Sequence, residues 1–551
     1  MIWGIDFGTS TSLLSYSARG PVRTALMGSA NNWIPSLAGR RDGRYVFGEE
    51  ALPLSDLDLV SAVKRRITEG NHETVTIGWG KSAAEVEVDE IVLGLLKTVR
   101  LKGQGLFGSD DITARLGCPA IWDGPRRRRL LDLADKAGLE VGDSPLVDEP
   151  IAACISWVQD EITSGNQVQG SVLVYDMGGG TLDVAVIAVD TVTGNSPKYF
   201  VKSSTGAPIA GEKIDEAIVE YLCRQIAEDY GIGLERVVEE SVWLRRPARE
   251  IKESLSRNRS VTLPYVHPAF GEIVLRLSQT QLAQLAAPLL DLAWQSVLKA
   301  LRDARLTHFS EGRWGTGVHL SEVFKMDASA LLANVDYVVL AGGMAPMRAI
   351  RDIFLGQNVP EHKIRVAGGR LGAPNEAISR GLAEDLNSQQ LNLARPAFDL
   401  VVEWGKYSTN SAGETAADSS GEITIFEAYS PLYKAGNPGT IPRFKWEPDD
   451  QLPYSSYASL KVIDRNTGER IRFNIHGQRD SSMELDFAAS SLRHITLAPN
   501  GNLLIVGQGS KPLHQVRVAS WPVLKDSEDR SVTVVLKGDE FTPYEPMWWE
   551  G

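Results

Sequence analysis

The sequence has few cysteines, no long apolar run and no surplus of positive charge, and each shortage excludes a class of protein. Its three cysteines, in 551 residues, lie in apolar surroundings without metal-ligand spacing, so we expect buried thiols in a reducing compartment. No run of eighteen apolar residues and no basic leader occur, so we expect a cytoplasmic protein without a membrane partner. The net charge of −13 argues against a broad surface for nucleic acid.

The main basic cluster is a run of four arginines at residues 126–129. It opens an amphipathic pattern, Pro125 to Ala137, in which Leu130, Leu133 and Ala134 recur at helical spacing. A solvated helix face explains such a run better than an RNA site does. We therefore expect these arginines to be exposed.

Two segments far apart in the chain share one layout. Residues 1–17 (MIWGIDFGTSTSLLSYS) and 171–189 (SVLVYDMGGGTLDVAVIAV) each contain an apolar strand, an aspartate, a turn rich in glycine and threonine, and a second strand. The aspartates are Asp6 and Asp176. A single turn of this kind is equally well explained as a tight connection between core strands, but two copies favour a device that grips a polyphosphate between two lobes.

The residue types in the two turns suit phosphate and magnesium. Glycines let backbone N–H groups approach phosphate oxygens, and neighbouring hydroxyls add donors. The aspartates would repel phosphate without a hard cation between them, and Mg²⁺, which keeps most of its waters, matches one or two carboxylates. Asp183 shares a strand face with Thr181 and is suited to hold a metal-bound water. The predicted phosphate-binding residues are Gly8, Thr9, Ser10, Thr11, Gly178, Gly179, Gly180 and Thr181, and Asp6 and Asp176 are predicted to hold Mg²⁺, mostly through water.

Length and periodicity predict several units, roughly three or four. Strand-like and helical segments alternate to about residue 385, including a third apolar strand that ends in glycines at 335–343, which indicates a two-lobed α/β protein. From residue 422, short alternating runs separated by turn signals predict an antiparallel β-sandwich. The expected organisation is a nucleotide-binding domain at 1–385, a linker at 386–401 and a β-rich domain at 402–551.

Several motifs carry a resemblance to a known family. They are DFGTS (6–10), VDEPIAA (147–153), DMGGGTLDV (176–184), LAGGM (340–344) and PNEAI (374–378). Their order resembles that of the actin-like ATPases, and AVKRRI (62–67) and ESLSRNRSVTLPY (253–265) resemble in particular the heat-shock 70 kDa chaperones (DnaK-like). The resemblance covers about residues 1–385. It implies an α/β fold of two duplicated RNase H-like lobes, with ATP or ADP and Mg²⁺ as cofactors.

Carried over by position, the resemblance assigns roles to individual residues. Lys64 is expected to contact the γ-phosphate and the attacking water, Glu149 to orient that water, and Asp176, Thr181 and Asp183 to complete the catalytic group. Phosphoryl transfer needs such positioning and charge neutralisation. The alternatives are a solvated Lys64 and a Glu149 that only stabilises a helix N-terminus. Further nucleotide-binding residues implied by the resemblance are Gly211, Glu212, Lys252, Ser256, Gly342, Gly343, Met344 and Asn375.

The nucleoside end of the expected site departs from the family pattern. Arg249 stands where an acidic residue is usual, and residues 210–213 (AGEK) replace a Gly-Gly-Glu-Asp pattern. Residues 344–346 (MAP) replace small polar residues and an arginine that stacks on adenine, which leaves Arg348 as a substitute. We therefore expect intact phosphate chemistry with a weaker or altered base preference.

The resemblance also implies an activity and partners. ATP hydrolysis would close the lobes and control polypeptide binding by the β domain, which has no counterpart of the family's helical lid. The expected partners are a polypeptide client, a nucleotide exchange factor and a J-domain co-chaperone on a separate chain, since no His-Pro-Asp tripeptide occurs. Three alternatives stay open: a small-molecule kinase of the same superfamily, an actin-like filament and a nucleotide-locked scaffold.

Overall fold

The computed structural model describes most of the first 384 residues and the strands of the C-terminal region. The described residues are 1–17, 20–70, 74–78, 83–108, 112–122, 124–192, 196–306, 308–310, 313–315, 325–368, 372–384, 391–392, 398–405, 420–427, 444–448, 452, 457–464, 470–475, 481–497, 502–510, 512–518, 534–537 and 540–543.

The first sheet is built around an N-terminal hairpin. Its strands follow the order β11-β10-β1-β2-β3, with β4 also paired to β2. The hairpin pair β1 and β2 is antiparallel, whereas β1 pairs parallel with β10 and β10 with β11. The almost continuous burial along β1 is typical of a strand covered on both faces. The strand bounds are Ile2–Phe7 (β1), Thr11–Ser17 (β2), Arg23–Thr24 (β3), Trp33–Pro35 (β4), Thr113–Cys118 (β10) and Val141–Asp148 (β11).

The second sheet repeats this pattern. Its order is β20-β19-β12-β13-β14-β21, in which β12 and β13 form the antiparallel hairpin and β12 pairs parallel with β19, as β19 does with β20. The two predicted hairpins therefore occupy equivalent places in two equivalent sheets. The bounds are Gln169–Met177 (β12), Leu182–Asp190 (β13), Lys198–Ala207 (β14), Tyr337–Ala341 (β19), Ile364–Val366 (β20) and Leu391–Asn392 (β21).

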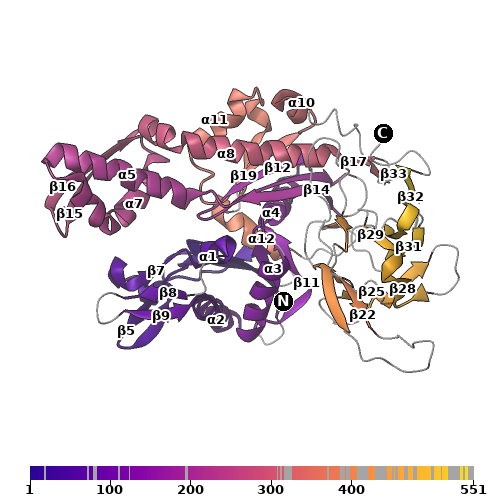
Figure 1. Ribbon diagram of the computed structural model, residues 1–551. Helices are drawn as coiled ribbons and strands as arrows, with labels where there is room; N and C mark the ends of the chain where they lie inside the picture. Colours follow the sequence, from indigo (N-terminus) through magenta and orange to yellow (C-terminus); the bar gives the residue numbers. More distant parts are fainter. Residues whose placement is uncertain are drawn as a thin grey trace.

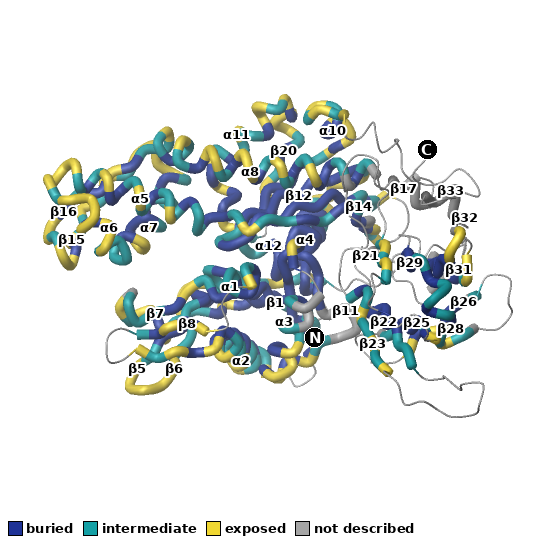
Figure 2. Tube along the Cα trace, in the orientation of Figure 1, coloured by how far each residue is buried: buried dark blue, intermediate teal, exposed yellow. Residues whose placement is uncertain are grey.

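Helices α4 (Glu149–Thr163) and α12 (Ala377–Leu382) lie between the two sheets (Figure 1). Their packing is close, because a Cβ at Gly381 would lie 1.8 Å from the carbonyl oxygen of Ala152. A buried ion pair, 2.6 Å between Arg380 Nη2 and Asp160 Oδ1, also joins them. In Figure 2 this central layer is mainly dark blue, and the exposed residues gather at the periphery. Each lobe also has a hydrophobic cluster of its own, and the cluster around α4 and α12 lies where the two lobes meet.

Outer helices cover the remaining sheet faces. Helices α2 and α3 pack with the first sheet, and α8 packs on β13 and β14 of the second. Helix α2 has Asp89 and Glu90 in its first turn and is followed by Gly108 in a left-handed conformation, which are common start and stop features. The bounds are Val88–Phe107 (α2), Gly124–Lys136 (α3), Gln279–Leu306 (α8), Ala328–Leu332 (α10) and Arg348–Gly356 (α11).

Each lobe carries an inserted subdomain. In the first lobe these elements are β5 (Ala38–Arg41), β6 (Arg44–Phe47), η1 (Gly48–Ala51), η2 (Asp56–Asp58), β7 (Leu59–Val60), α1 (Val63–Glu69), β8 (Thr74–Ile77) and β9 (Ala84–Glu87). In the second they are α5 (Gly211–Tyr230), α6 (Leu234–Glu239), η4 (Ser241–Leu244), α7 (Arg245–Leu255), β15 (Ser260–His267) and β16 (Gly271–Ser278). Because η2 contacts η4, the two subdomains meet at their tips.

Two antiparallel sheets of the C-terminal region share one hydrophobic cluster, and β32 (Val534–Lys537) and β33 (Glu540–Pro543) form a further two-stranded sheet. The orders of the two larger sheets are β23-β22-β25-β28 and β24-β29-β30-β31-β26-β27. Phe398 and Leu460 from the first sheet pack in the same cluster as Ile495 and Leu503 from the second. Strand β22 begins at Phe398, within the segment expected to be linker. The bounds are Phe398–Trp404 (β22), Gly421–Phe426 (β23), Phe444–Trp446 (β24), Tyr457–Asp464 (β25), Phe473–Ile475 (β26), Ser481–Ser482 (β27), Leu485–Ala488 (β28), Leu492–Leu497 (β29), Asn502–Gly507 (β30) and Pro512–Val518 (β31).

Two expectations from composition can be compared with the structure. Cys118, Cys154 and Cys223 are free and buried, as predicted. The expectation that the arginine run is solvated is wrong for Arg127, whose side chain is buried and lies 2.7 Å from Asp148 Oδ1. No helix in the described ranges is long and apolar enough to cross a membrane.

Candidate functional site

The two glycine-rich turns touch each other across the lobes. A Cβ at Gly179 would lie 2.5 Å from Ser10 Oγ, and one at Gly180 would lie 2.5 Å from Thr9 Oγ1. Within the turns, Gly8 lies against the carbonyl of Thr11, and the Gly178 amide donates to the Thr181 carbonyl at 3.0 Å. The predicted phosphate-binding residues of both lobes are therefore brought together.

A third glycine turn closes on the same place. Gly342 follows β19 with a φ of +79°, and a Cβ there would lie 2.4 Å from Asp176 Oδ1. Only glycine combines that backbone conformation with so close an approach. Gly343 is exposed, and no described atom lies within 4 Å of where its Cβ would be. The turn therefore packs directly against Asp176 at Gly342 and opens to solvent at Gly343.

Four carboxylates and one lysine form a buried cluster where the lobes meet. Lys64, on α1, makes a buried ion pair with Glu149, the first residue of α4. Asp183 accepts a hydrogen bond from the Ala120 amide at 2.6 Å and another from the Thr181 hydroxyl. The buried carboxylates are those of Asp6, Glu149, Asp176 and Asp183. All residues predicted to be catalytic thus lie in one region.

Burial and mutual repulsion favour the neutral forms of these aspartates. Burial raises the pKa of Asp6 to about 7, against the pull of Lys64, and raises the pKa of Asp183 to about 8. The pKa of Asp176 is also well above its usual value, first through burial and then through Glu149 and Asp183. For Lys64, burial lowers the pKa, but the charges of Glu149 and Asp6 outweigh it and the net shift is upward. When all four carboxylates are ionised, their negative charge exceeds what Lys64 can offset.

These residues fit Mg²⁺. Asp176 Oδ1 is buried and has no hydrogen-bond partner among the described residues, which leaves an acceptor for a cation or its water. A divalent cation would also offset the surplus carboxylate charge. In the described part of the chain, no group of three or more His, Cys, Asp and Glu residues could hold a metal. Asp6 and Asp176 would supply one or two carboxylates, the number that suits an ion that keeps most of its waters.

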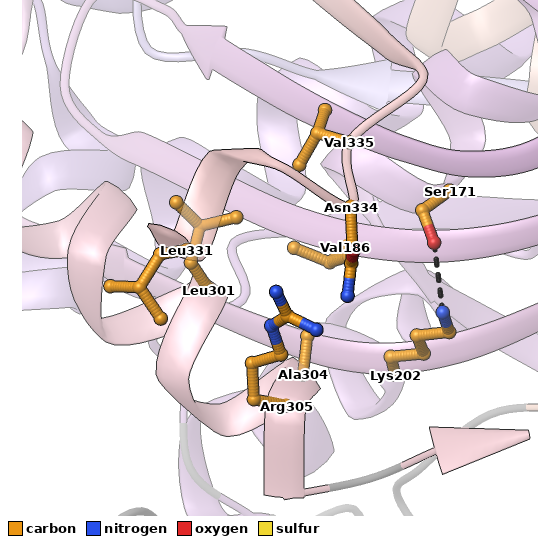
Figure 3. A pocket seen from close by; sticks show the side chains of 9 residues that line it. All are labelled: Ser171, Val186, Lys202, Leu301, Ala304, Arg305, Leu331, Asn334 and Val335. Carbon is orange, nitrogen blue, oxygen red and sulfur yellow. Dashed lines mark hydrogen bonds between the residues drawn. The ribbon is translucent and has the colours of Figure 1, made fainter. Parts of the chain in front are cut away.

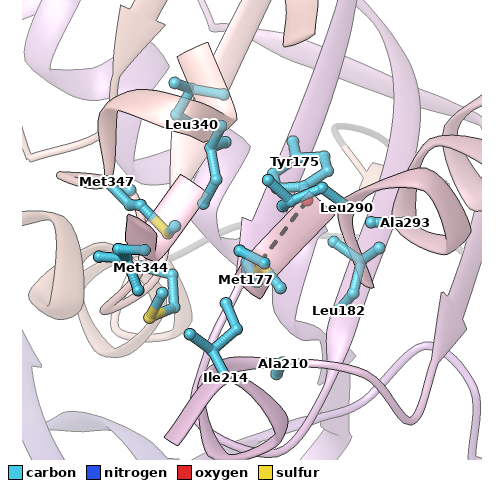
Figure 4. Packing of buried hydrophobic residues seen from close by; sticks show 14 of the residues in the cluster. Tyr175, Met177, Leu182, Ala210, Ile214, Leu290, Ala293, Leu340, Met344 and Met347 are labelled. Atoms are coloured by element: carbon cyan, nitrogen blue, oxygen red, sulfur yellow. Dashed lines mark hydrogen bonds between the residues drawn. The ribbon is translucent and has the colours of Figure 1, made fainter. Parts of the chain in front are cut away.

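The residues predicted to bind the nucleoside are less concentrated. Lys252 Nζ donates to the Gly211 carbonyl at 3.0 Å and lies 2.7 Å from Asp215 Oδ1. Met344 belongs to the hydrophobic core, where Figure 4 shows it near Ala210 and Ile214. Glu212 is ion-paired with Arg65 at 3.5 Å.

The remaining predicted residues lie at helix boundaries. The Ser256 hydroxyl donates to the Glu253 carbonyl at 2.6 Å, so it satisfies the end of its own helix. Asn375 lies half-buried in the short helix η6 (Pro374–Glu376). Arg348, the suggested replacement for the stacking arginine, is exposed at the start of α11. The geometry therefore ties Lys252 and Glu212 to the site region more firmly than Ser256 or Arg348.

Arg249 contacts the site in a way that the sequence analysis missed. Its Nη2 donates to Ser10 Oγ at 3.0 Å, and its Nε lies 3.8 Å from Asp215 Oδ2, so it joins α7 of one lobe to the first turn of the other. Arg65 makes a second connection across the lobes, 2.9 Å to Glu216. The available signal was spacing: Arg249 precedes Lys252 by three residues and so shares its helix face.

Comparison with known families agrees with this geometry. A family model described as Hsp70 protein matches residues 2–311, more than half of the chain. The chain belongs to the Hsp70 family. Hsp70 proteins are ATP-dependent chaperones with an actin-like α/β ATPase fold, so the predicted resemblance is confirmed at this level. The matched range ends before the C-terminal sheets begin.

Proposed function

We propose that this chain hydrolyses ATP between its two lobes and uses the hydrolysis to control polypeptide binding by its C-terminal region. The observation that carries the proposal is the buried cluster of carboxylates and Lys64, supplied by both lobes beside paired glycine turns. Buried carboxylates whose ionised forms repel one another are unfavourable in a purely structural core, and a bound cation would offset that cost.

In this proposal the protein positions reactants and supplies charge. Backbone amides of the turns and the hydroxyls of Thr9, Ser10, Thr11 and Thr181 bind the phosphates. Lys64 lies against the γ-phosphate, and Glu149, held by that lysine, orients the attacking water. Asp6 and Asp176 would hold Mg²⁺, mostly through water, and the bound ion would supply positive charge to offset that of the phosphates.

The nucleoside is proposed to lie toward α7 and the third glycine turn. Gly211, Glu212, Lys252, Ser256, Gly342, Gly343, Met344 and Asn375 are the residues proposed to line this end. Since the exposed Arg348 and the buried Met344 do not reproduce the stacking arginine, we propose a relaxed preference for the base. Calorimetric titration with ATP and GTP tests this, and tight binding of ATP alone would contradict it.

The C-terminal region is proposed to be the client-binding domain, a β-sandwich joined by the linker at 386–401. One backbone contact supports communication between the parts: Leu391 and Asn392 of β21 pair parallel with Tyr199 and Phe200 on β14. Residues from the expected linker thereby extend the second sheet. A J-domain protein and a nucleotide exchange factor are the proposed partners, and nucleic acid is not.

The hydrolytic role is tested with Thr181→Ala. We expect ATP to remain bound while single-turnover hydrolysis slows roughly tenfold or more, the effect of losing one positioned hydroxyl. Thr262→Ala, at an exposed position on β15, is the matched control and should hydrolyse at the wild-type rate. Equal rates for both variants would show that the site is misassigned, and phosphate recovered on a small molecule would indicate a kinase.

Communication is tested by limited proteolysis. If β21 docks more firmly when nucleotide closes the lobes, ATP will slow cleavage within 386–401. Asn392→Pro removes a backbone donor from β21 and should abolish that protection while leaving ATP binding unchanged. Equal cleavage of the wild type with and without ATP would argue against the coupling.

A further inference from the structure

Helix α7 brings two cations to the glycine turns. Arg249 and Lys252 are three residues apart, so they lie on one face of the helix. Arg249 Nη2 donates to Ser10 Oγ in the first turn at 3.0 Å. Lys252 Nζ donates to the Gly211 carbonyl at 3.0 Å, and the Gly211 amide donates to the Gly178 carbonyl in the second turn at 3.1 Å. One helix face therefore places positive charge beside both turns.

Asp215, on α5, is the acidic partner that these two cations share. One of its oxygens lies 2.7 Å from Lys252 Nζ, which is a close ion pair. The other oxygen lies 3.8 Å from Arg249 Nε, so this second pair is loose. The Arg249 side chain is 39% exposed, whereas that of Lys252 is 10% exposed. Asp215 thus binds Lys252 closely, while the Arg249 guanidinium stays accessible to a ligand.

The contact with Ser10 puts Arg249 where a phosphate is proposed to bind. A Cβ at Gly179 would lie 2.5 Å from the same Ser10 Oγ, so this hydroxyl lies where the two turns meet. A guanidinium has five N–H donors in a planar fork, and its hydrogen bonds to phosphate are among the strong ones. A phosphate oxygen that accepts from the Ser10 hydroxyl therefore comes within reach of Arg249.

The side chains expected at the base end are placed differently. Met344 is buried in the hydrophobic core, and Arg348 is exposed at the first residue of α11. Among the described residues, neither of these side chains is held against a glycine turn by a hydrogen bond, as that of Arg249 is. The placed cations of the cleft therefore act on phosphate rather than on a base.

We propose that Arg249 binds the phosphate chain of the ligand beside Ser10, and that the cleft therefore recognises a magnesium-bound polyphosphate more than a base. This inference rests on the proposed function, because it assigns a ligand contact to the same cleft. It extends the class of ligands to inorganic tripolyphosphate, which has the phosphates and no nucleoside. Removing Arg249 should weaken the binding of both kinds of ligand together.

The test is calorimetry of the full chain in Mg²⁺ with two probes, ADP and inorganic tripolyphosphate. Arg249→Met removes the charge and the donors at similar side-chain length. Both probes should then bind at least about tenfold more weakly, a loss of about 1.4 kcal/mol. Arg249→Lys keeps the charge but not the planar fork, so it should recover part of the affinity for both probes.

Two controls remove a cation elsewhere in the same lobe. Arg245→Met is a change at an exposed position of the same helix. Lys202→Met removes a half-buried cation that lines a separate pocket at the C-terminal end of α8 and donates to Ser171 Oγ at 2.8 Å (Figure 3). Both controls should bind ADP and tripolyphosphate as the wild type does. Without ligand, Arg249→Met and Arg245→Met should melt at the same temperature, and a lower value for Arg249→Met would show a structural role instead.

Other results would also overturn the inference. One is an unchanged affinity of Arg249→Met for both probes. Another is weaker binding of ADP alone, because Arg249 would then act on the nucleoside. A wild type that binds ADP but not tripolyphosphate would show that recognition needs the nucleoside. If the wild type binds both probes and hydrolyses no ATP, only the proposed function fails, whereas a wild type that binds neither probe would overturn both.

Discussion

Raising the pH should destabilise the nucleotide-free N-terminal part of this protein through Asp6. The folded-state pKa of Asp6 is raised from 3.8 to about 7, chiefly by burial. A group with a raised pKa contributes its full stability below the unfolded value and loses it as the pH rises through the folded value. The stability contributed by Asp6 is therefore present below about pH 4 and is lost by about pH 7.

The size of this effect follows from the shift. While the folded protein retains a proton that the unfolded chain has released, stability falls by about 1.4 kcal/mol for each pH unit per group. For Asp6 the total is at most about 4 kcal/mol. Asp183, whose pKa is raised to about 8, adds a similar slope over the same range. In a protein of ordinary stability this loss is large.

The assay is urea unfolding in EDTA between about pH 5 and pH 6.5. The transition to follow is that of the N-terminal part, which is recognised because Mg²⁺ and ADP shift it. Asp6→Asn removes the titrating group. Its free energy of unfolding should therefore fall with rising pH less steeply than that of the wild type, by about 1.4 kcal/mol per pH unit. Asp291→Asn, exposed on α8, should keep the wild-type slope. Identical slopes for the wild type and Asp6→Asn would refute the account of a buried carboxyl that resists ionisation. With Mg²⁺ and ADP present, Asp6→Asn should gain less stability than the wild type, because it lacks a carboxylate for the metal.

Three further substitutions test contacts between and within the lobes. Gly180→Ala places a methyl group against Thr9 and should weaken ADP binding about tenfold in calorimetry. Gly105→Ala, with no described atom near its new methyl group, should leave the affinity unchanged. Equal affinities of the two variants would mean that the turns shift to accommodate the added methyl group. Arg249→Ala loses the hydrogen bond to Ser10 and should release ADP several-fold faster in stopped flow than Arg245→Ala, a change at an exposed residue of the same helix. Equal release rates would show that Arg249 does not help to hold the two lobes closed. Arg127→Met removes the buried cation next to Asp148 and should lower the free energy of unfolding by about 3 kcal/mol. Arg129→Met breaks a partly exposed ion pair and should lower it by under about 1 kcal/mol. Equal losses would contradict the argument from burial.

The parts of the fold that sequence predicts are those that local chemistry determines. The hairpins around Asp6 and Asp176 follow from short apolar runs joined by glycine turns, and both form where expected. Helix α4 begins at Glu149, where a proline in the first turn favours a helix start. In the C-terminal region the short apolar runs LKVI (460–463) and LLIV (503–506) both form strands. Each of these features is determined by residues that are close together in the sequence.

Contacts between distant segments were predicted less well. The burial of Arg127 could have been foreseen, because it precedes Leu130 by three residues and Ala134 by seven and so shares their inward face. Its partner, Asp148, could not, since nothing in a local pattern places β11 beside α3. The bond from Arg249 to Ser10 depends in the same way on how the two lobes approach each other. Strand order and lobe placement are set by packing over the whole chain.

The acidic cluster explains why nucleotide rather than the protein alone should favour closed lobes. Asp6 belongs to one sheet and Asp176 to the other, so their repulsion grows as the lobes approach and contributes to the raised pKa of Asp176. Opening the lobes would relieve that repulsion and rehydrate both carboxylates. Under the proposed function, a metal-bound polyphosphate between the turns would reverse the balance, because its cation would attract both aspartates only when they are close. The ligand would then interact differently with the open and closed forms, as a switch requires. Removing either aspartate should therefore abolish that difference rather than merely weaken binding.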